Sequence, residues 1–366
     1  MAARVMIRVM ILAGGTGGHI YPALAVAREL REQGCEVAWM GTRAGMEARL
    51  VPAAGFPIEW LSVTGFRGKG LVAKLKAPFK LARACWQAVK ILLRNRPNVV
   101  LGMGGFVAGP GGIVAKLLRI PLVVHEQNRI PGTTNRMLVK WARVVLEAFP
   151  DSFPAASGAR WVGNPLRREI VQADPAEKTK RGDQLKVLVL GGSQGAMALN
   201  RAVPEAAAMT DAKRRDGGGT IRVLHQTGEA MRAETEALYQ RLGVDARVVA
   251  YIEDMAEAYR WADLAVCRAG AMTVSELMAA GLPSALVPYP HAIDDHQTHN
   301  ARYLADAGAA VLIPQSELTP ERLSRELTDL SQKPGRLTEM SRSARLLAKL
   351  DAARVVAEVC LHEAHP

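Results

Sequence analysis

The N-terminal half of the chain alternates short apolar runs with longer stretches whose apolar residues recur at helical spacing. The apolar runs predict strands at Val5–Ala13, Glu36–Met40, Val99–Gly102, Leu122–His125 and Val144–Ala148. The intervening stretches predict helices that include Pro22–Gln33, Leu71–Asn95, Gly111–Leu118 and Thr133–Trp141. Strands that alternate with helices in this way are typical of a parallel sheet covered by helices on both faces.

The alternation returns after a proline-bearing stretch, Phe149–Pro165, which we interpret as a hinge. A second set of strands is predicted at Lys186–Leu190, Ile221–Gln226, Arg247–Tyr251, Leu264–Cys267, Ser284–Val287 and Ala310–Ile313, and the stretch Thr338–His362 is predicted to be helical throughout. We therefore expect an α/β fold of two Rossmann-like, parallel-sheet domains that face each other across a cleft. Residues 1–163 and 164–343 would form the domains, and a C-terminal helix, 344–366, would pack back on the first.

Two glycine-rich turns follow predicted strands, one in each half. The first is Gly14-Gly15-Thr16-Gly17-Gly18-His19 and the second is Gly191-Gly192-Ser193-Gln194-Gly195. Each leads into a helix, whose first N–H groups and positive dipole end would face a ligand. The first turn lacks both the G-x-G-x-x-G spacing and the later acid of the dinucleotide fingerprint.

Composition narrows the class of protein. A chain of 366 residues, 49% hydrophobic and 22% charged, fits two globular domains. Its four cysteines are scattered and include no C-x-x-C pair, which argues for a reducing compartment and against a zinc site. No secretory signal is evident. The uncharged stretch Val99–Ala115 contains six glycines and Pro110, so we predict a strand and turn there rather than a membrane span.

The net charge of +12 is unevenly distributed. Between Trp60 and Leu146 the only acid is Glu126, against fifteen lysines and arginines. The first half should therefore carry a positive field, which suits an anionic membrane surface, nucleic acid or phosphorylated ligands.

His19, at the start of the first predicted helix, is the first candidate for chemistry. A neutral imidazole at a ligand-facing turn can accept a proton. Alternatively, His19 only caps the turn, and composition does not separate the two interpretations.

The run His125-Glu126-Gln127-Asn128 follows a predicted strand, where ligands bind in parallel sheets. Such a dense group of donors and acceptors favours a binding or catalytic role over a plain polar loop.

A third candidate is the helix start 268–276, whose small residues would let N–H groups bind a diphosphate. Glu276 could accept hydrogen bonds from a ribose diol. The histidine-rich loop Tyr289–Asn300 lacks convincing metal-ligand spacing, so we interpret it as a sugar-orienting loop and predict no metal. Because no D-x-D occurs, helix dipoles and an arginine, for which Arg167 is the candidate, would have to neutralise a leaving diphosphate.

The basic segment Phe66–Arg96 carries nine lysines and arginines and no acid. Apolar anchors interleave with the cations at helical spacing, as an interfacial helix on anionic lipid requires. Part of the apolar stripe should also pack on the sheet, and no nucleic-acid motif is present. The predicted membrane-docking residues are Leu71, Lys74, Leu75, Lys76, Phe79, Lys80, Arg83, Trp86 and Lys90.

Together these stretches closely resemble the MurG family of peptidoglycan N-acetylglucosaminyltransferases. The matching runs are Gly14–His19, Gly102–Phe106, His125–Asn128, Val162–Arg167, Gly191–Ala196 and Thr273–Glu276. The resemblance implies a GT-B fold, the donor UDP-N-acetylglucosamine and a muramyl-pentapeptide acceptor on undecaprenyl diphosphate. It also implies a peripheral location on the cytoplasmic face of the bacterial inner membrane, contacts with cell-wall synthesis or division proteins, and no cofactor.

The resemblance implies that the N-terminal domain binds the lipid acceptor and the membrane and that the C-terminal domain binds the donor, and it assigns donor contacts by motif. In the C-terminal half these are Ser193, the backbone near Ile252, Ala271, Met272, Thr273, Val274, Ser275, Glu276 and Gln297, with Thr16, Gly17, Gly18, Asn128 and Arg167 expected to complete the site. The loop 289–299 matches the family loosely, so the contact of Gln297 is the least specific.

We predict a single displacement at the anomeric carbon of the donor, with inversion, by the 4-hydroxyl of the muramyl sugar. His19 is the first choice for the base, and His125 or Glu126 is the alternative. Two other functions stay open: an isomerase like UDP-N-acetylglucosamine 2-epimerase, and a non-catalytic nucleotide-sugar sensor.

Overall fold

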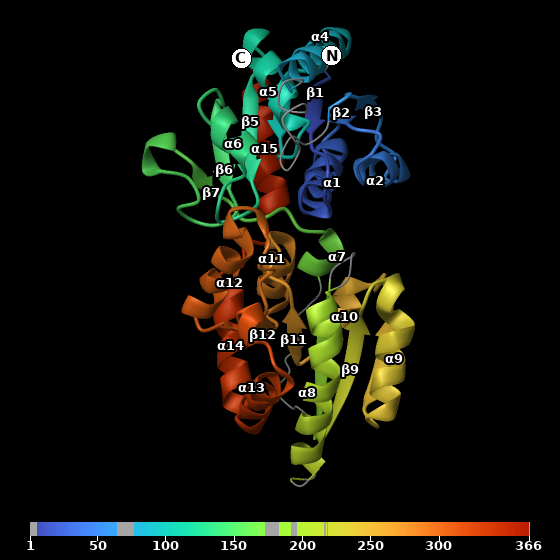
Figure 1. Ribbon diagram of the computed structural model, residues 1–366. Coiled ribbons are helices and arrows are strands. Elements are labelled where there is room, and N and C mark those ends of the chain that lie inside the picture. The colour runs from blue at the N-terminus through green and yellow to red at the C-terminus, as the bar shows by residue number, and fades with distance from the viewer. Residues whose placement is uncertain are drawn as a thin grey trace. The chain divides into compact units, whose positions relative to one another are not determined.

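The computed structural model describes residues 6–63, 77–172, 183–191, 196–215, 217 and 219–365. The chain forms two compact units (Figure 1). The first comprises Met1–Arg167 and Lys349–Pro366, and the second comprises Arg168–Ala348. The roles that the sequence suggests for the two domains, acceptor binding and donor binding, stay predictions.

The described part of the first unit is built on a parallel sheet of seven strands in the order β3-β2-β1-β4-β5-β6-β7. The strands are β1 (Arg8–Leu12), β2 (Glu36–Gly41), β3 (Ile58–Trp60), β4 (Val99–Gly102), β5 (Leu122–Glu126), β6 (Val144–Glu147) and β7 (Arg160–Trp161). The helices are α1 (Gly17–Glu32), α2 (Glu47–Ala53), α4 (Ala77–Asn95), α5 (Ala108–Leu117), α6 (Thr133–Leu138) and α15 (Ala352–Ala364), with a short 3₁₀ turn η1 (Ala155–Ser157).

Alternation along the central strand β1 explains why both faces of this sheet are covered. Val9 and Ile11 lie in the core shared with α1 and α15, whereas Met10 and Leu12 lie in the core shared with α4 and α5. Successive side chains of a strand point to opposite faces, so a wholly apolar strand requires helices on both. The C-terminal helix α15, drawn in red, packs against α1 and β4 (Figure 1).

The described part of the second unit repeats the plan with six parallel strands in the order β10-β9-β8-β11-β12-β13. The strands are β8 (Gln184–Leu190), β9 (Thr220–Gln226), β10 (Asp245–Val249), β11 (Leu264–Cys267), β12 (Ser284–Leu286) and β13 (Ala310–Leu312). The helices are α7 (Arg168–Val171), α8 (Met197–Arg215), α9 (Arg232–Arg241), α10 (Met255–Trp261), α11 (Ala271–Ala280), α12 (His296–Asp306), α13 (Pro320–Gln332) and α14 (Pro334–Leu346), with 3₁₀ turns η2 (Glu229–Met231), η3 (Ile293–Asp295) and η4 (Gln315–Glu317).

In both sheets the order in which strands are added changes side at the first strand. β1 lies between β2 and β4, and β8 lies between β9 and β11. Loops leaving the carboxyl ends of such neighbouring strands diverge to opposite faces, and the opening between them is where ligands bind in parallel α/β sheets. The glycine turn after β1 and the loop after β11 therefore both occupy ligand-binding positions of their own sheets.

Several predicted boundaries change. The helix predicted from Pro22 begins at Gly17, and the helix predicted from Gly111 begins at Ala108. The proline-bearing stretch interpreted as a hinge lies within the first unit, next to its boundary at Arg167, and adds β7 at the edge of the sheet, and its role as a hinge stays a prediction. The short strands β3 and β7 were missed, because three and two residues are too few for a periodic signal.

The C-terminal segment predicted as one helix forms two, α14 and α15, separated by a turn at 347–351. The chain passes from the second unit to the first within this turn. Gly163 has φ of +85°, and a side chain on it would collide with Lys349. The chain leaving the first unit and the chain returning to it therefore touch at a position that requires glycine.

Candidate active site

The first glycine turn places His19 at the carboxyl end of its sheet. β1 ends at Leu12 and α1 begins at Gly17, so His19 lies in the first turn of α1, where it is half-buried. The loop after β4 packs directly on the imidazole. Gly104 has φ of +92°, and a Cβ atom there would lie 2.9 Å from the His19 ring. Glycine at 104 thus allows the backbone to form one wall around His19.

A buried acid that the sequence analysis missed holds the same turn. Glu47, the first residue of α2, has an exposed fraction of 0%. Its Oε2 accepts a hydrogen bond from the N–H of Gly15 at 2.9 Å. Its Oε1 accepts from the N–H and the hydroxyl of Thr42 at 2.9 and 2.7 Å. The sequence did carry a signal for this buried side chain, the glycines at 41 and 45. A Cβ atom at either position would collide with the side chain of Glu47, so both positions favour glycine.

A chain of hydrogen bonds leads from His19 into the interior. Nδ1 of His19 lies 2.8 Å from Oε1 of Gln127. Nε2 of Gln127 lies 3.1 Å from Nδ1 of His125 and 3.0 Å from the carbonyl oxygen of His125. Nε2 of His125 lies 2.9 Å from the carbonyl oxygen of Gly163. The sequence placed His125 and Gln127 in one motif, but only the fold connects them to His19.

His125, the first alternative base, is fully buried, and both of its ring nitrogens take part in this chain. Burial lowers the pKa of His125 from 6.5 to about 4, with a smaller opposing effect from the hydrogen bond to Gly163. The imidazole is therefore neutral at neutral pH, and its two nitrogens make hydrogen bonds inside the unit.

Glu126, the second alternative, shapes its own loop. Only 1% of the residue is exposed. Oε1 accepts from the N–H and the side-chain amide of Asn128, at 2.9 and 3.3 Å. Oε2 accepts from the N–H of Gly132 at 3.0 Å and from Nδ2 of Asn135 at 2.8 Å. A carboxylate with four donors is well suited to fixing a loop. The geometry therefore favours His19 over both alternatives.

The predicted donor contacts of the first unit lie around α1 and β5. Thr16 is exposed, and Gly17 and Gly18 are half-buried, so the start of α1 is accessible. The guanidinium of Arg167 lies 5.6 Å from the centre of the Tyr21 ring, which places Arg167 beside the same helix. Asn128, also half-buried, lies in the loop that Glu126 shapes.

In the second unit the loop after β11 leads into α11. The N-cap is Gly270, which offers no side-chain cap, and the first turn contains no acid. The first N–H groups of an α-helix have no acceptor within the helix, so those of Ala271, Met272 and Thr273 mark an anion-binding position. The side chains of Val274 and Ser275 are buried, and the N–H of Val274 already donates to the carbonyl oxygen of Gly270 at 2.9 Å, so the geometry does not favour the predicted contact at Val274.

Glu276 lies in the second turn of α11, and 9% of the residue is exposed. The hydroxyl of Tyr259, on α10, donates to Oε2 of Glu276 at 2.8 Å. The bond orients the carboxylate from a neighbouring helix. Tyr259 is therefore a supporting residue that the sequence analysis did not identify.

The sequence analysis included Arg268 only as the first residue of the helix start 268–276. In the structure its side chain holds the histidine-rich loop in place. Its Nη1 donates to the carbonyl oxygens of Val287 and Pro288, at 3.1 and 3.2 Å, and its Nη2 donates to Oε1 of Gln315 at 2.6 Å. The guanidinium also lies 5.5 Å from the centre of the Tyr289 ring. The start of the loop is thus held in place by one half-buried cation.

Gln297 closes this loop, because its Oε1 accepts from the N–H of Tyr289 at 2.9 Å. Nearby, Nδ1 of His296 lies 2.6 Å from the carbonyl oxygen of Ile293. Within the part of the chain that the structure describes, no group of three histidine, cysteine, aspartate or glutamate side chains could hold a metal ion.

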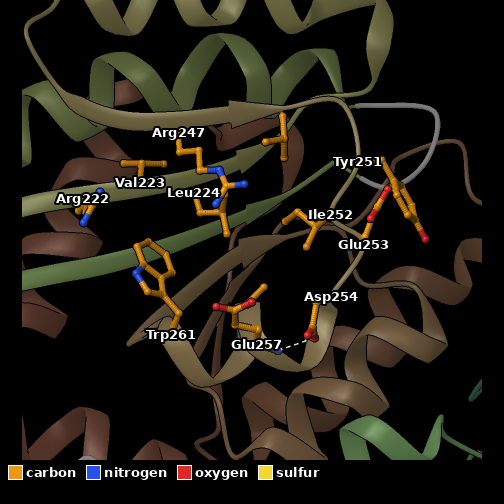
Figure 2. Close-up of a pocket in the computed structure, with 12 residues that line it drawn as sticks. Arg222, Val223, Leu224, Arg247, Tyr251, Ile252, Glu253, Asp254, Glu257 and Trp261 are labelled. Carbon is orange, nitrogen blue, oxygen red and sulfur yellow. Dashed lines mark hydrogen bonds between the residues drawn. The ribbon is translucent and has the colours of Figure 1, made fainter.

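A pocket of about 410 Å³ lies on the outer part of the second sheet, between β9, β10 and α10. Figure 2 shows Arg247 and Leu224 on the strands and Trp261 and Glu257 on the helix across from them. Of the predicted donor residues that are described, only Ile252 lines it. The N–H of Ile252 donates to Oε1 of Gln226 at 3.0 Å, so a uracil contact through that N–H would have to displace Gln226.

Helix α4 divides its apolar residues between two faces. Ala84, Ala88, Ile91 and Leu92 are buried in the unit. Phe79 (80% exposed), Trp86 (58%) and Leu93 (56%), spaced seven residues apart, lie on the solvent side. The ammonium of Lys90 lies 3.6 Å from the centre of the Trp86 ring, and Lys80 and Arg83 are exposed as well. The predicted anchors at Leu71, Lys74, Leu75 and Lys76, like the predicted donor residue Ser193, lie outside the described residues.

Among the residues described, no helix combines the length and the apolar character needed to cross a bilayer.

Comparisons with known proteins fit this arrangement. Models of the glycosyltransferase family 28 N-terminal and C-terminal domains match residues 9–147 and 186–357. The UDP-N-acetylglucosamine--N-acetylmuramyl-(pentapeptide) pyrophosphoryl-undecaprenol N-acetylglucosamine transferase of Methylococcus capsulatus is 61% identical over 98% of this chain and 99% of its own length. The crystal structure of Acinetobacter baumannii MurG has a TM-score of 0.84 and 42% identity, and the match covers 97% of this chain and 99% of that one.

A UDP-N-acetylglucosamine 2-epimerase from Neisseria meningitidis also aligns with this chain, with a TM-score of 0.67 over 97% of this chain and 100% of that one. At 13% identity, this likeness shows the fold alone.

Two parallel-sheet units, each with ligand-facing loops at its strand ends, and these similarities define a GT-B glycosyltransferase. The chain belongs to glycosyltransferase family 28 and, within it, to the MurG family of N-acetylglucosaminyltransferases. The predicted family, the two-sheet α/β fold and the enzyme class are confirmed. The roles of the individual site residues stay predictions.

Proposed function

We propose that this enzyme transfers N-acetylglucosamine from UDP-N-acetylglucosamine to the 4-hydroxyl of undecaprenyl-diphosphoryl-N-acetylmuramoyl-pentapeptide, in peptidoglycan synthesis. Identity of 61% along nearly the whole length of a relative that carries this name supports the substrates. The single structural observation that carries the chemistry is His19, half-buried at a ligand-facing helix start and held through one ring nitrogen by Gln127.

The transfer is a single displacement. Nε2 of His19 takes the proton of the acceptor hydroxyl while that oxygen forms a bond to the anomeric carbon of the donor. The bond between the anomeric carbon and the diphosphate oxygen breaks, and its electron pair leaves with UDP. Attack from the side opposite the leaving group inverts the α-linked donor to a β-linked product.

The choice of His19 rests on access. His125 is completely buried with both nitrogens engaged, and Glu126 accepts from four donors in the following loop and α6. Recruiting either as a base would require dismantling bonds that hold the site together. His19 alone of the three combines partial exposure with a ring nitrogen pointing away from its protein partner.

The second unit would hold the donor. The start of α11, capped only by Gly270, offers N–H groups and a helix dipole to the diphosphate. Glu276, oriented by Tyr259, would bind the ribose, and Ser193, Ile252 and Gln297 would bind the remaining parts of UDP-N-acetylglucosamine. Arg167, Asn128, Thr16, Gly17 and Gly18 would contribute from the first unit. Dipoles and a cation would then stabilise departing UDP without a metal.

The first unit would take the lipid acceptor. The exposed face of α4 presents two aromatic rings, Phe79 and Trp86, among basic side chains. Aromatic anchors beside cations favour binding to the surface of an anionic bilayer without insertion of a spanning helix. We therefore place the enzyme on the cytoplasmic face of the bacterial inner membrane as a peripheral protein.

One assay tests the reaction: UDP release and sugar products are followed with UDP-N-acetylglucosamine in the presence and absence of the lipid-linked muramyl acceptor. Release that depends on the acceptor, with a disaccharide product, supports the transferase. Conversion of the nucleotide sugar without acceptor would establish an isomerase instead. Donor binding without either outcome would leave only a sensor, and the proposal would fail.

A further inference from the structure

The side chain of Gln127 connects the proposed base to the interior of the unit. It is 1% exposed and touches His19 through its oxygen and His125 through its nitrogen. We propose that Gln127 is a positioning residue that fixes His19 as the tautomer protonated at Nδ1, so that Nε2 is the nitrogen that accepts the proton of the acceptor hydroxyl. This inference rests on the proposed role of His19.

The orientation of the Gln127 amide follows from a carbonyl group. The carbonyl oxygen of His125 can only accept, so the amide atom 3.0 Å from it must be the nitrogen. The amide oxygen then faces Nδ1 of His19 at 2.8 Å. Since that oxygen can only accept, Nδ1 of His19 carries the proton. In a neutral imidazole the other nitrogen, Nε2, is then the acceptor.

The His125 end of this series of hydrogen bonds leads independently to the same assignment of protons. The carbonyl oxygen of Gly163 lies 2.9 Å from Nε2 of His125, so that nitrogen carries a proton. Nδ1 of His125 is then an acceptor, and it lies 3.1 Å from the amide nitrogen of Gln127. Two carbonyl groups on different segments thus require one arrangement of protons, and a flipped Gln127 would oppose both.

The surroundings keep this arrangement from reversing. Burial lowers the pKa of His125 to about 4, so its Nδ1 stays an acceptor at neutral pH. Nδ2 of Asn164 donates to the main-chain oxygen of Gln127 at 3.0 Å, and Nδ2 of Asn135 donates to that of His125 at 3.1 Å. Other titratable groups at this end of the sheet include Glu126, the last residue of β5, its neighbour Glu147 on β6, and Glu47 on α2.

The test reads the tautomer directly, by ¹⁵N NMR of the histidine rings in the full-length protein at neutral pH, with His19→Gln used to assign the His19 signals. The wild type should show a protonated Nδ1 and an unprotonated Nε2. Gln127→Met, which keeps the volume but offers no acceptor, should populate the other tautomer. Gln127→Glu, which keeps an acceptor oxygen, should retain the Nδ1-protonated form. Gln87→Met, a change of the same kind on α4 where the amide bonds to Ser62, should leave the His19 signals unchanged.

Turnover is measured on the same proteins. We expect Gln127→Met to lower kcat about tenfold or more, a part of the roughly 10²–10⁴-fold that a positioned base supplies, with little change in KM for the donor. Gln127→Glu should recover part of that loss. A wild-type spectrum with Nε2 protonated, an unchanged tautomer in Gln127→Met, or a changed tautomer without loss of kcat would each overturn the proposal.

The wild-type spectrum needs no variant to fold, so it decides the tautomer in any case. The proposed function fails separately: if His19→Gln keeps nearly full turnover, His19 is not the base, whatever the tautomer measurement shows.

Discussion

Two helix starts lie at predicted ligand-binding positions, α1 after β1 in the first unit and α11 after β11 in the second, and their surroundings differ. Beside α1, the N–H of Gly15 is already bonded to the buried carboxylate of Glu47. Neither helix has an acid in its own first turn, and the N-cap of α11 is Gly270. A negative charge held at one helix start disfavours a second anion there, whereas the other helix start can take a diphosphate.

This difference teaches that a glycine-rich turn after a parallel strand does not by itself identify a phosphate site. In the first unit the turn supports an imidazole, because Gly104 and Gln127 surround His19 and Glu47 holds the loop. In the second unit the start of α11, which follows β11, offers helix N–H groups and a carboxylate, Glu276, that Tyr259 orients. If the proposed roles hold, one unit is arranged for proton transfer and the other for binding the nucleotide.

The kinetics of His19→Ala are the most direct test of the proposed difference between α1 and α11. If α1 serves proton transfer, turnover should fall by about 10²–10⁴-fold, the usual contribution of a positioned base, while KM for UDP-N-acetylglucosamine stays nearly constant. Steady-state assays with the lipid-linked acceptor measure both quantities. Turnover within a few-fold of the wild type would remove His19 as the base.

Glu47→Ala tests whether the acid organises the first turn. The change leaves the N–H of Gly15 and both donors of Thr42 without their acceptor, so the free energy of unfolding should fall by about 3 kcal/mol. Urea unfolding followed by circular dichroism gives the value. Glu36→Ala, which removes an exposed acid paired with Arg8, should cost under about 0.5 kcal/mol. Equal losses in the two variants would contradict the assignment.

Each unit also contains a buried histidine that should make its stability pH-dependent. Burial lowers the pKa of His125 to about 4 and that of His225 to about 3, from 6.5. As the pH falls below 6.5, the two histidines bind protons in the unfolded chain but stay neutral in the folded chain. The free energy of unfolding therefore decreases as the pH falls from 6.5 toward the lowered pKa values, and this contribution is fully present above pH 6.5. The loss should reach about 3 kcal/mol for His125 and about 4 kcal/mol for His225 near their lowered pKa values.

Urea unfolding at pH 7 and pH 5 measures this loss. His225→Gln should reduce the difference between the two pH values, whereas His365→Gln, at an exposed position, should not change it. Identical pH dependence in His225→Gln and the wild type would show that His225 is not the source.

Glu276→Gln tests the binding role of α11. Losing a hydrogen bond from a ribose to a charged oxygen should weaken UDP binding about tenfold to a hundredfold, with a smaller effect on turnover at saturating donor. Calorimetry with UDP measures the affinity. Glu257→Gln removes a carboxylate from the pocket shown in Figure 2 and should leave UDP affinity unchanged. The opposite result would move the donor site from α11 to that pocket.

The smallest effect on chemistry is expected on α4. Phe79→Ser combined with Trp86→Ser should weaken binding to anionic vesicles about tenfold, because two exposed aromatic anchors are lost. Turnover with a water-soluble acceptor analogue should stay constant. Vesicle flotation measures the binding, and Leu346→Ser, which removes an exposed apolar side chain of the second unit, is the matched control. Equal losses in both proteins would show that α4 is not the docking surface.

Much of the fold could be predicted from the chain alone, because its signals are local. Apolar runs such as those of β1, β5 and β11 require cover on both faces, and helices between them require parallel pairing. His19, His125 and Glu276 were likewise named as candidates from their places at or after the ends of predicted strands, and their roles stay predictions. The edge strands β3 and β7 and the break between α14 and α15 were missed, because short elements leave no period to detect.

The sequence by itself determined the family, the two parallel sheets and the loops in which ligands would bind. The tertiary structure alone decided that Glu47 holds the first turn, that Gln127 connects His19 to His125, and which apolar residues of α4 stay exposed. The physical reason is distance along the chain: His19 and Gln127 lie 108 positions apart, and Gly15 and Glu47 lie 32 apart. Periodicity and capping act over a few neighbouring residues, whereas a hydrogen bond forms wherever packing brings a donor within reach of an acceptor.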